Sequence, residues 1–208
     1  MRPGQAAWVE DPGYQGAQAA FRAAGARLIP IPVDAEGVRW MDAPEVPRLM
    51  HVTPSHQYPL GSTMSIGRRQ ELLAYAAQHD AYILEDDYDS EFRYEGYPLP
   101  SLQGMDTKSR VIYVGTFSKV LAPTLRLGYV VLPPALVGAF RAWRRATDQG
   151  SPLPLPAGLA PFVAEGHLER HIARMRRQYR ARRDALLAAL PDAAWEPALA
   201  GLHVVVGP

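Results

Sequence analysis

Residues 115–129 read GTFSKVLAPTLRLGY, and this stretch decides how the rest of the chain is interpreted. It places Lys119 directly after one apolar, strand-like run at residues 110–117 and before a second at residues 125–132. The chain has only two lysines, Lys108 and Lys119, although arginine is abundant. An arginine stays protonated in a protein, whereas a lysine can lose its proton and act as a nucleophile. The stretch therefore raises the question whether Lys119 is needed as an amine.

The composition is that of an ordinary globular protein, with 48% hydrophobic and 21% charged residues. A chain of 208 residues is long enough for one substantial core. The net charge of +1 gives no general attraction to nucleic acid or to a membrane. The absence of cysteine excludes disulfides, thiolate chemistry and Cys-ligated zinc. No apolar run is long enough to span a bilayer and the start lacks a signal-peptide pattern, so we expect a soluble, cytoplasmic protein.

Strand-like runs alternate with helical stretches, which predicts an α/β fold with a mostly parallel sheet. We expect strands at residues 7–10, 27–33, 49–52, 81–84, 110–117 and 125–132, and helices at 15–24 and 65–79. Pro30 and Pro32 confine the second strand to an edge or to an irregular segment. Beyond Pro134 we expect helices at 135–147 and 167–190, a bend at 150–156 and a lone strand at 201–206.

Polar residues follow three of the predicted strands. Residues 56–58 (HQY) come after the third strand, an acidic run at residues 85–91 after the fourth, and Ser118 with Lys119 after the fifth. Ligands bind outside the carboxyl ends of the strands in open parallel sheets. We therefore expect these side chains to converge on one rim of the sheet.

The acidic run EDDYDSE at residues 85–91 has three interpretations. A solvated loop is the usual one for a run of charges, and a divalent metal site is the second. The third is a single buried aspartate that holds a cationic heterocycle. Because the run follows a buried strand, we expect at least Glu85 to lie inside, where its carboxylate needs a partner.

Lys119 has a common interpretation as a surface or phosphate-binding lysine. Its apolar neighbours instead predict burial, which lowers a lysine pKa and yields the neutral amine that forms a Schiff base. Thr116, Ser118 and Arg126 supply two hydroxyls and a guanidinium suited to a phosphate ester. Together with a strand-end aspartate, these groups point to pyridoxal phosphate, which needs an amine, an anion site and an acid at its ring nitrogen.

Five segments in order carry a resemblance to a known family: WVEDPGY (8–14), VTPSHQYPLG (52–61), EDDYDSEFRY (85–94), GTFSKVLAPTLRLGY (115–129) and HLERHIARMRRQYRARRDALL (167–187). They resemble the fold-type I, pyridoxal phosphate-dependent aminotransferases. More closely, they resemble the aminotransferase-like domain of the MocR branch of the GntR transcription regulators. The resemblance implies a large domain with helices on both sheet faces at 1–134, connecting helices at 135–190 and the start of a small α+β domain at 191–208.

The resemblance also implies a role for each candidate site residue. Lys119 would form the internal aldimine with the cofactor and shuttle the α-proton, and Asp86 would pair with the pyridinium nitrogen. Tyr88 would hydrogen-bond the ring hydroxyl, and Tyr14 would stack on the ring. The phosphate would be bound by Arg126, Ser118 and Thr116. Without the resemblance, Tyr14 and Tyr88 would be packing aromatics and Arg126 a salt-bridge partner.

Some features of the family are missing or altered in this sequence. Gln57 and Tyr58 stand where many relatives carry an asparagine, and the sequence leaves open which of them, if either, reaches the cofactor. A glycine-rich phosphate loop, an upstream winged-helix domain and a downstream substrate-binding arginine are also lacking. We therefore expect a fragment. No metal ligand is assigned.

Three functions fit these features. The first is the pyridoxal phosphate-binding sensor domain of a MocR-type regulator, with an amino acid or amine as effector. The second is a class I aminotransferase, which exchanges an amino group between an amino acid and a 2-oxo acid. The third is a non-enzymatic or metal-binding domain that uses the acidic run. The resemblance predicts a homodimer. The apolar stripe of the arginine-rich helix at 167–190 predicts packing, with no DNA or membrane contact from this chain.

Overall fold

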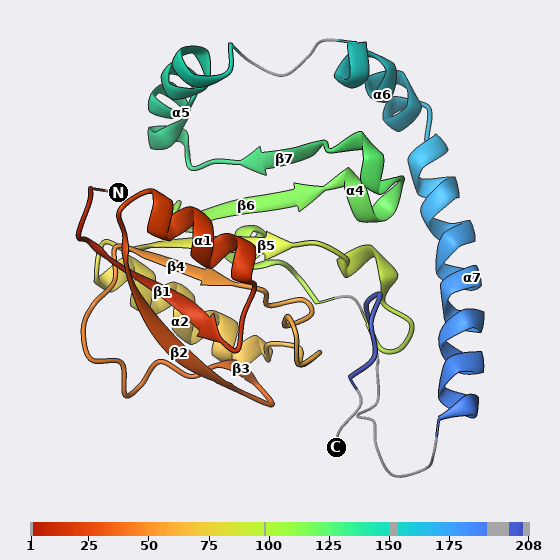
Figure 1. Ribbon diagram of the computed structural model, residues 1–208, viewed down its shortest axis with the longest axis horizontal. Helices are drawn as coiled ribbons and strands as arrows, with labels where there is room; N and C mark the ends of the chain where they lie inside the picture. Colours follow the sequence, from red (N-terminus) through yellow and green to blue (C-terminus); the bar gives the residue numbers. More distant parts are fainter. Residues whose placement is uncertain (1, 98, 150–153, 191–199, 206–208) are drawn as a thin grey trace.

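The computed structural model describes residues 2–97, 99–149, 154–190 and 200–205 (Figure 1). Its centre is a seven-stranded sheet in the order β3-β2-β1-β4-β5-β6-β7. The strands are β1 (Ala6–Asp11), β2 (Arg27–Asp34), β3 (Gly37–Val38), β4 (Leu49–Val52), β5 (Tyr82–Asp87), β6 (Val111–Thr116) and β7 (Gly128–Val131). The five central strands are parallel, and β3 and β7 are antiparallel to their neighbours. The predicted, mostly parallel sheet is confirmed.

Two crossover helices cover opposite faces of this sheet, as the sequence predicted. Helix α1 (Gln15–Ala23) connects β1 to β2, and α2 (Ile66–Gln78) connects β4 to β5. The two connections move across the sheet in opposite directions, so right-handed crossovers place the helices on opposite faces. Figure 1 shows α1 in front of the sheet and α2 behind it. The direction in which the chain crosses the sheet therefore reverses between β1 and β4. Ligands bind at such a switch point in open α/β sheets.

The main core lies between the sheet and α2. Trp8, Met50, Ile83 and Val111 are paired across four neighbouring strands and form one buried row. Leu72 and Ala76 of α2 belong to the same cluster. The helix begins where the sequence predicted, because the Ser65 hydroxyl accepts a hydrogen bond of 3.2 Å from the Arg68 amide.

The later part of the chain is helical. It contains α3 (Leu102–Met105), α4 (Phe117–Val120), α5 (Pro134–Thr147), α6 (Pro154–Ala164) and α7 (His167–Ala189), with 3-10 turns η1 (Ser90–Phe92) and η2 (Pro123–Leu125). Figure 1 shows α7 beside the end of the sheet at which β5 and β6 finish. Tyr179 of α7 packs edge-on against Phe92 of η1, with ring centroids 5.0 Å apart. No helix in the described part of the chain is long and apolar enough to cross a membrane.

Two predicted elements differ from the structure. Residues 154–156 begin α6 and are not a bend, because proline is well tolerated in the first turn of a helix; residues 150–153 lie outside the described residues. The strand predicted at 201–206 is also wrong over 201–205, where the only pairing in the described segment is an isolated bridge between Ala200 and Arg93. Val206 and most of the predicted small domain at 191–208 lie outside the described residues.

The ends of two predicted strands also move. Strand β7 begins only at Gly128, because residues 123–125 form η2 and Arg126 adopts a left-handed conformation. Strand β5 continues to Asp87, beyond the predicted end at residue 84. The first acidic residues therefore belong to a strand, whose alternation sends successive side chains to opposite faces.

Candidate functional site

One pocket of about 570 Å³ lies at the carboxyl ends of β1, β4, β5 and β6. All seven residues selected from the sequence line it: Tyr14, Asp86, Tyr88, Thr116, Ser118, Lys119 and Arg126. The structure adds six residues that the sequence reading did not assign to it: Thr53, Tyr58, Leu127, Gly128, Leu202 and His203. The expected convergence of strand ends on one rim is therefore confirmed. The volume falls in the range of small-molecule sites, roughly 300–1,000 Å³.

Lys119 stands at the mouth of the pocket on the short helix α4. Thr116 ends β6 and caps this helix, because its hydroxyl accepts a hydrogen bond of 3.1 Å from the Ser118 amide. The expectation that Lys119 is buried is wrong, since its side chain is exposed. Helix α4 has only four residues and lies on the open rim, so flanking apolar residues do not enclose the amine.

Arg126 approaches the same rim from the turn before β7. It follows η2 and has φ +47° and ψ +35°, a left-handed conformation that is unusual for a residue with a side chain. The carbonyl of the next residue, Leu127, accepts a hydrogen bond of 2.9 Å from the Phe117 amide. This bond fastens the turn to the start of α4, so the arginine and Lys119 are held on adjoining segments.

Asp86 is the acid of the run that faces the pocket. Its Oδ2 lies 3.2 Å from Nε2 of the buried His51 on β4. Glu85 points to the opposite face, is fully buried, and accepts hydrogen bonds of 2.8 Å each from the Leu102 and Gln103 amides. Burial raises the pKa of Glu85, and these amides oppose the rise. The expectation of an interior, partnered Glu85 is confirmed.

Three tyrosines form an aromatic wall of the pocket. Tyr14 and Tyr58 meet edge to face with ring centroids 5.9 Å apart. Gly16 permits this position of Tyr14, because a β-carbon at Gly16 would overlap the Tyr14 ring. The Tyr88 hydroxyl donates a hydrogen bond of 2.9 Å to the His56 carbonyl. Burial raises the pKa of Tyr88, and so do the nearby carboxylates of Asp89 and Asp86.

Gln57 is directed away from the pocket, so Tyr58 is the residue of this pair that reaches it. The Gln57 amide group donates to the Pro12 carbonyl at 2.8 Å and to Oε2 of Glu10 at 3.3 Å. Glu10 in turn accepts hydrogen bonds from the Thr53 amide at 3.1 Å and the Thr53 hydroxyl at 2.6 Å. Burial raises the pKa of Glu10, opposed by these hydrogen bonds. Glu10 thus supports the loop after β4.

The donor set suits pyridoxal phosphate. A primary amine (Lys119), a guanidinium (Arg126) and a carboxylate (Asp86) line one pocket together with hydroxyl groups and aromatic rings. The amine complements the aldehyde of the cofactor, and the guanidinium and hydroxyl groups complement its phosphate. The carboxylate complements the protonated pyridine nitrogen, and the aromatic rings complement the flat ring. The residues present therefore fit this cofactor.

Comparison with known proteins agrees with this chemistry. The sequence profile of the family described as aminotransferase class I and II matches residues 1–206. The chain belongs to the class I and II aminotransferase family. Pyridoxal phosphate is the cofactor of this family, as the sequence predicted. The solved kynurenine aminotransferase of Pyrococcus horikoshii, in complex with PMP, is 33% identical with a TM-score of 0.88. The alignment covers 97% of this chain and 54% of that aminotransferase, which confirms the fold-type I architecture.

Among curated proteins, this aminotransferase-family chain is similar to transcription regulators. It is 46% identical over 186 residues to the probable rhizopine catabolism regulatory protein MocR of Rhizobium meliloti, covering 89% of this chain and 38% of that protein. It is 37% identical over 201 residues to the pyridoxine biosynthesis regulator PdxR of Corynebacterium glutamicum, covering 95% and 44%. The predicted resemblance to the MocR branch is confirmed. The chain spans less than half the length of these two relatives.

Proposed function

We propose that this chain is the pyridoxal phosphate-binding, aminotransferase-like part of a MocR-type transcription regulator. In this proposal, the cofactor captures an amino acid or another amine as the effector. The observation that carries it is the placement of Lys119, Asp86 and Arg126 in one pocket. The regulator branch is favoured because identity reaches 46% with MocR but 33% with the aminotransferase structure. A role in transcription would place the protein in the cytoplasm.

The amine, the acid and the ring contacts have separate tasks in this proposal. Pyridoxal phosphate supplies an aldehyde that reacts reversibly with amines and a ring that withdraws electrons from the captured amine. Lys119 holds the cofactor covalently and moves the proton at the α-carbon of the effector. Asp86, supported by His51, keeps a proton on the ring nitrogen. Tyr14 provides a flat contact for the cofactor ring, and Tyr88 forms a hydrogen bond with the hydroxyl group of that ring.

The anion site uses the segment on either side of the lysine. Arg126 carries a permanent positive charge and a forked set of donors that matches phosphate oxygens. Ser118 and Thr116 add hydroxyl groups on the same wall of the pocket. All three belong to the segment from the end of β6 to the start of β7, so one local structure sets both the anion site and the amine.

Borohydride trapping tests the proposed function directly. We expect pyridoxal phosphate followed by borohydride to add one phosphopyridoxyl group, which peptide mass spectrometry locates at Lys119. Lys119→Ala should lose the modification. Lys108→Ala is the matched control, since it removes the only other lysine of the chain and should keep it. Labelling of wild-type protein at Lys108 alone, or at neither lysine, would contradict the proposal.

Transamination is a second candidate function, favoured by the TM-score of 0.88 with an aminotransferase. The two functions differ in whether a product is released. A sensor should show a change in cofactor absorbance with an amine but form no product with an added 2-oxo acid. An aminotransferase should convert amino acid and 2-oxo acid into the exchanged pair, which chromatography of the mixture detects.

A homodimer is part of the proposal. Tyr129, Val130 and Val131 of β7 are each about two-fifths exposed, and Trp143 of α5 is 59% exposed. Exposed apolar side chains on these two elements would be buried against a second copy in a homodimer. Light scattering coupled to size-exclusion chromatography should give twice the mass of the chain. Trp143→Arg should shift the mass toward the monomer, whereas an exposed tyrosine elsewhere, Tyr97→Arg, should not.

A further inference from the structure

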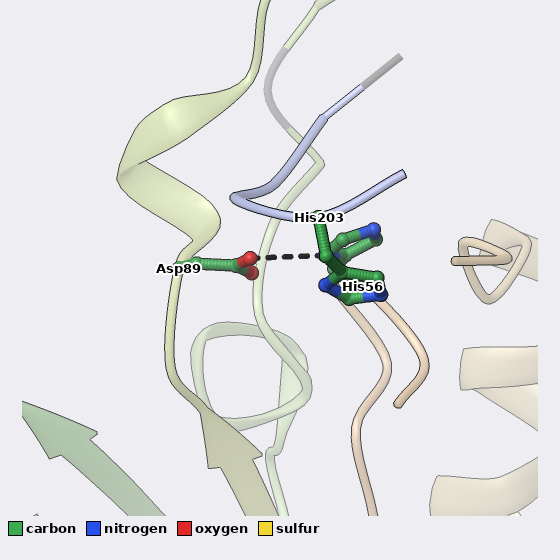
Figure 2. A group of neighbouring side chains, drawn as sticks. All are labelled: His56, Asp89 and His203. Atoms are coloured by element: carbon green, nitrogen blue, oxygen red, sulfur yellow. Dashed lines mark hydrogen bonds and ion pairs between the residues drawn. The ribbon is translucent and has the colours of Figure 1, made fainter. Parts of the chain in front are cut away.

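A compact group of two histidines and an aspartate lies at the edge of the pocket, and one of its histidines, His203, also lines the pocket. His56 comes from the loop after β4, Asp89 from the segment after β5, and His203 from the C-terminal segment 200–205. Figure 2 shows the Asp89 carboxylate pointing at the two imidazole rings, which lie one over the other. The ring centroids of His56 and His203 are 4.2 Å apart at an interplanar angle of 30°. His56 and Asp89 are 3% and 1% exposed.

Only some of the polar atoms in this group have hydrogen-bond partners among the described residues. Oδ2 of Asp89 lies 2.9 Å from Nδ1 of His56 and accepts a hydrogen bond of 3.0 Å from the Leu202 amide. The other oxygen, Oδ1, is buried and has no partner among the described residues, and the same is true of Nε2 of His203. A buried carboxylate oxygen without a partner is costly, so a positively charged or hydrogen-bonding group bound here would stabilise the arrangement.

We propose that His56, Asp89 and His203 form a binding site for a divalent transition-metal ion of the Zn²⁺ type. One ligand atom from each residue can be chosen so that all three lie within 4.8 Å of one another. Two imidazole nitrogens and one carboxylate oxygen are a set that Zn²⁺ and Co²⁺ accept, whereas Ca²⁺ and Mg²⁺ prefer oxygen ligands alone. The two unpartnered atoms, Asp89 Oδ1 and His203 Nε2, are natural ligands.

The existing geometry needs little adjustment. Ligand atoms around a tetrahedral Zn²⁺ ion lie about 3.4 Å apart, given metal–ligand bonds of about 2.1 Å. The chosen ligand atoms already lie within 4.8 Å of one another, so side-chain rotations of the histidines and the aspartate would bring them to this spacing. Oδ2 of Asp89 keeps its hydrogen bond from the Leu202 amide, which orients the metal-ligating carboxylate as outer partners do in known sites.

This site differs from the metal site that the acidic run alone suggested. The other carboxylates of that run are directed elsewhere: Glu85 accepts from backbone amides of α3, and Asp87 accepts from the Tyr113 hydroxyl at 2.8 Å. Within the described residues, His56, Asp89 and His203 are the only group of three or more potential ligands that come close together. A bound ion would fasten residues 200–203 to the loops that follow β4 and β5.

Cobalt binding to the untagged protein tests the proposal. We expect one Co²⁺ per chain, with visible absorption typical of nitrogen and oxygen ligands and a raised melting temperature. Zn²⁺ should displace the Co²⁺ and remove the absorption. His203→Ala and Asp89→Asn should weaken binding by at least about tenfold. His167→Ala, which removes an exposed histidine at the start of α7, should bind as the wild type does.

Two results would overturn the proposal. One is a wild-type protein that gives neither visible absorption nor a change in melting temperature with Co²⁺. The other is undiminished binding in His203→Ala. This variant changes a residue in a segment without helix or strand, so circular dichroism should show an unchanged fold and make its result decisive even if Asp89→Asn is unstable.

Discussion

His51 and Asp86 lie on neighbouring strands and meet at 3.2 Å, between Nε2 of the histidine and Oδ2 of the aspartate. His51 is 2% exposed, whereas the Asp86 side chain is 24% exposed and lines the pocket. A buried residue of β4 therefore sets the direction of the carboxylate that we assign to the cofactor ring nitrogen.

Replacing His51 tests this support. We expect His51→Leu, which removes the hydrogen-bonding nitrogen, to weaken pyridoxal phosphate binding roughly tenfold, because a hydrogen bond to a charged group contributes about 1.5 kcal/mol or more. An absorbance titration of the cofactor gives the dissociation constant. His79→Leu is the control, since His79 packs against Tyr75 at a tilted angle and does not line the pocket. Equal affinity in wild type and His51→Leu would show that Asp86 needs no such partner.

Arg126 should recognise the phosphate and not the ring. We expect Arg126→Ala to weaken pyridoxal phosphate binding roughly tenfold to a hundredfold, the effect of losing a charge-assisted hydrogen bond. Binding of pyridoxal, which lacks the phosphate, should change little. Comparison of the two ligands by titration separates the contacts. Arg177→Ala, on the exposed surface of α7, should leave both affinities unchanged. A parallel loss for both ligands would contradict the assignment.

Glu10 should make stability depend on pH. Burial raises its pKa above the ordinary value of 4.5, so the folded chain holds this proton more tightly than the unfolded chain. The contribution of Glu10 to stability therefore falls as the pH rises from about that ordinary value through the raised folded-state pKa. We expect Glu10→Gln to become more favourable relative to wild type at pH 8 than at pH 5. Denaturant unfolding at both values measures this difference.

The exposed Glu71 provides the control for Glu10. Glu71→Gln should shift stability by a similar small amount at the two pH values. If Glu10→Gln behaves in the same way, or loses stability relative to wild type on going to pH 8, the burial argument fails.

Gly201 should be required for the C-terminal segment to reach Asp89. Its φ is +85°, and a β-carbon there would overlap the His56 ring. We expect Gly201→Ala to cost the segment about 1–2 kcal/mol, which lowers protection of the Leu202 amide roughly fivefold to thirtyfold. Hydrogen exchange followed by mass spectrometry measures it. Gly67→Ala is the control, because nothing lies within 4 Å of a β-carbon there. Unchanged exchange in Gly201→Ala would contradict the prediction.

The sequence predicted the site residues that lie close together along the chain. It did not predict the contacts that depend on how the strands are ordered in the sheet. Thr116, Ser118, Lys119 and Arg126 occupy one segment, so their proximity follows from local sequence. His51 and Glu10 escaped notice because each is a buried strand residue whose neighbour depends on strand order and register. The exposure of Lys119 was mispredicted for a related reason. The apolar residues next to Lys119 in the sequence do not determine its exposure. Its exposure is set by the position of α4 on the open rim of the sheet, which depends on the tertiary structure.

The two misassigned segments have separate causes. Pro154 and Pro156 suggested a bend, but both lie in the first turn of α6, where proline is tolerated. The apolar segment GLHVVV at 201–206 suggested a strand, but a strand requires a partner. Within the described residues 200–205, the segment instead uses the Leu202 amide to bind Asp89.

The pocket joins Tyr14 near the start of the chain to His203 near its end. The segments that form its walls are far apart in the sequence. They meet only after long stretches of chain have closed into loops, and such distant contacts slow folding. A partly folded chain that lacks β6 has neither the lysine nor the arginine of the site. Uptake of cofactor should consequently lag behind the appearance of helical circular dichroism during refolding, which makes bound pyridoxal phosphate a kinetic reporter of the last steps in assembly of the sheet.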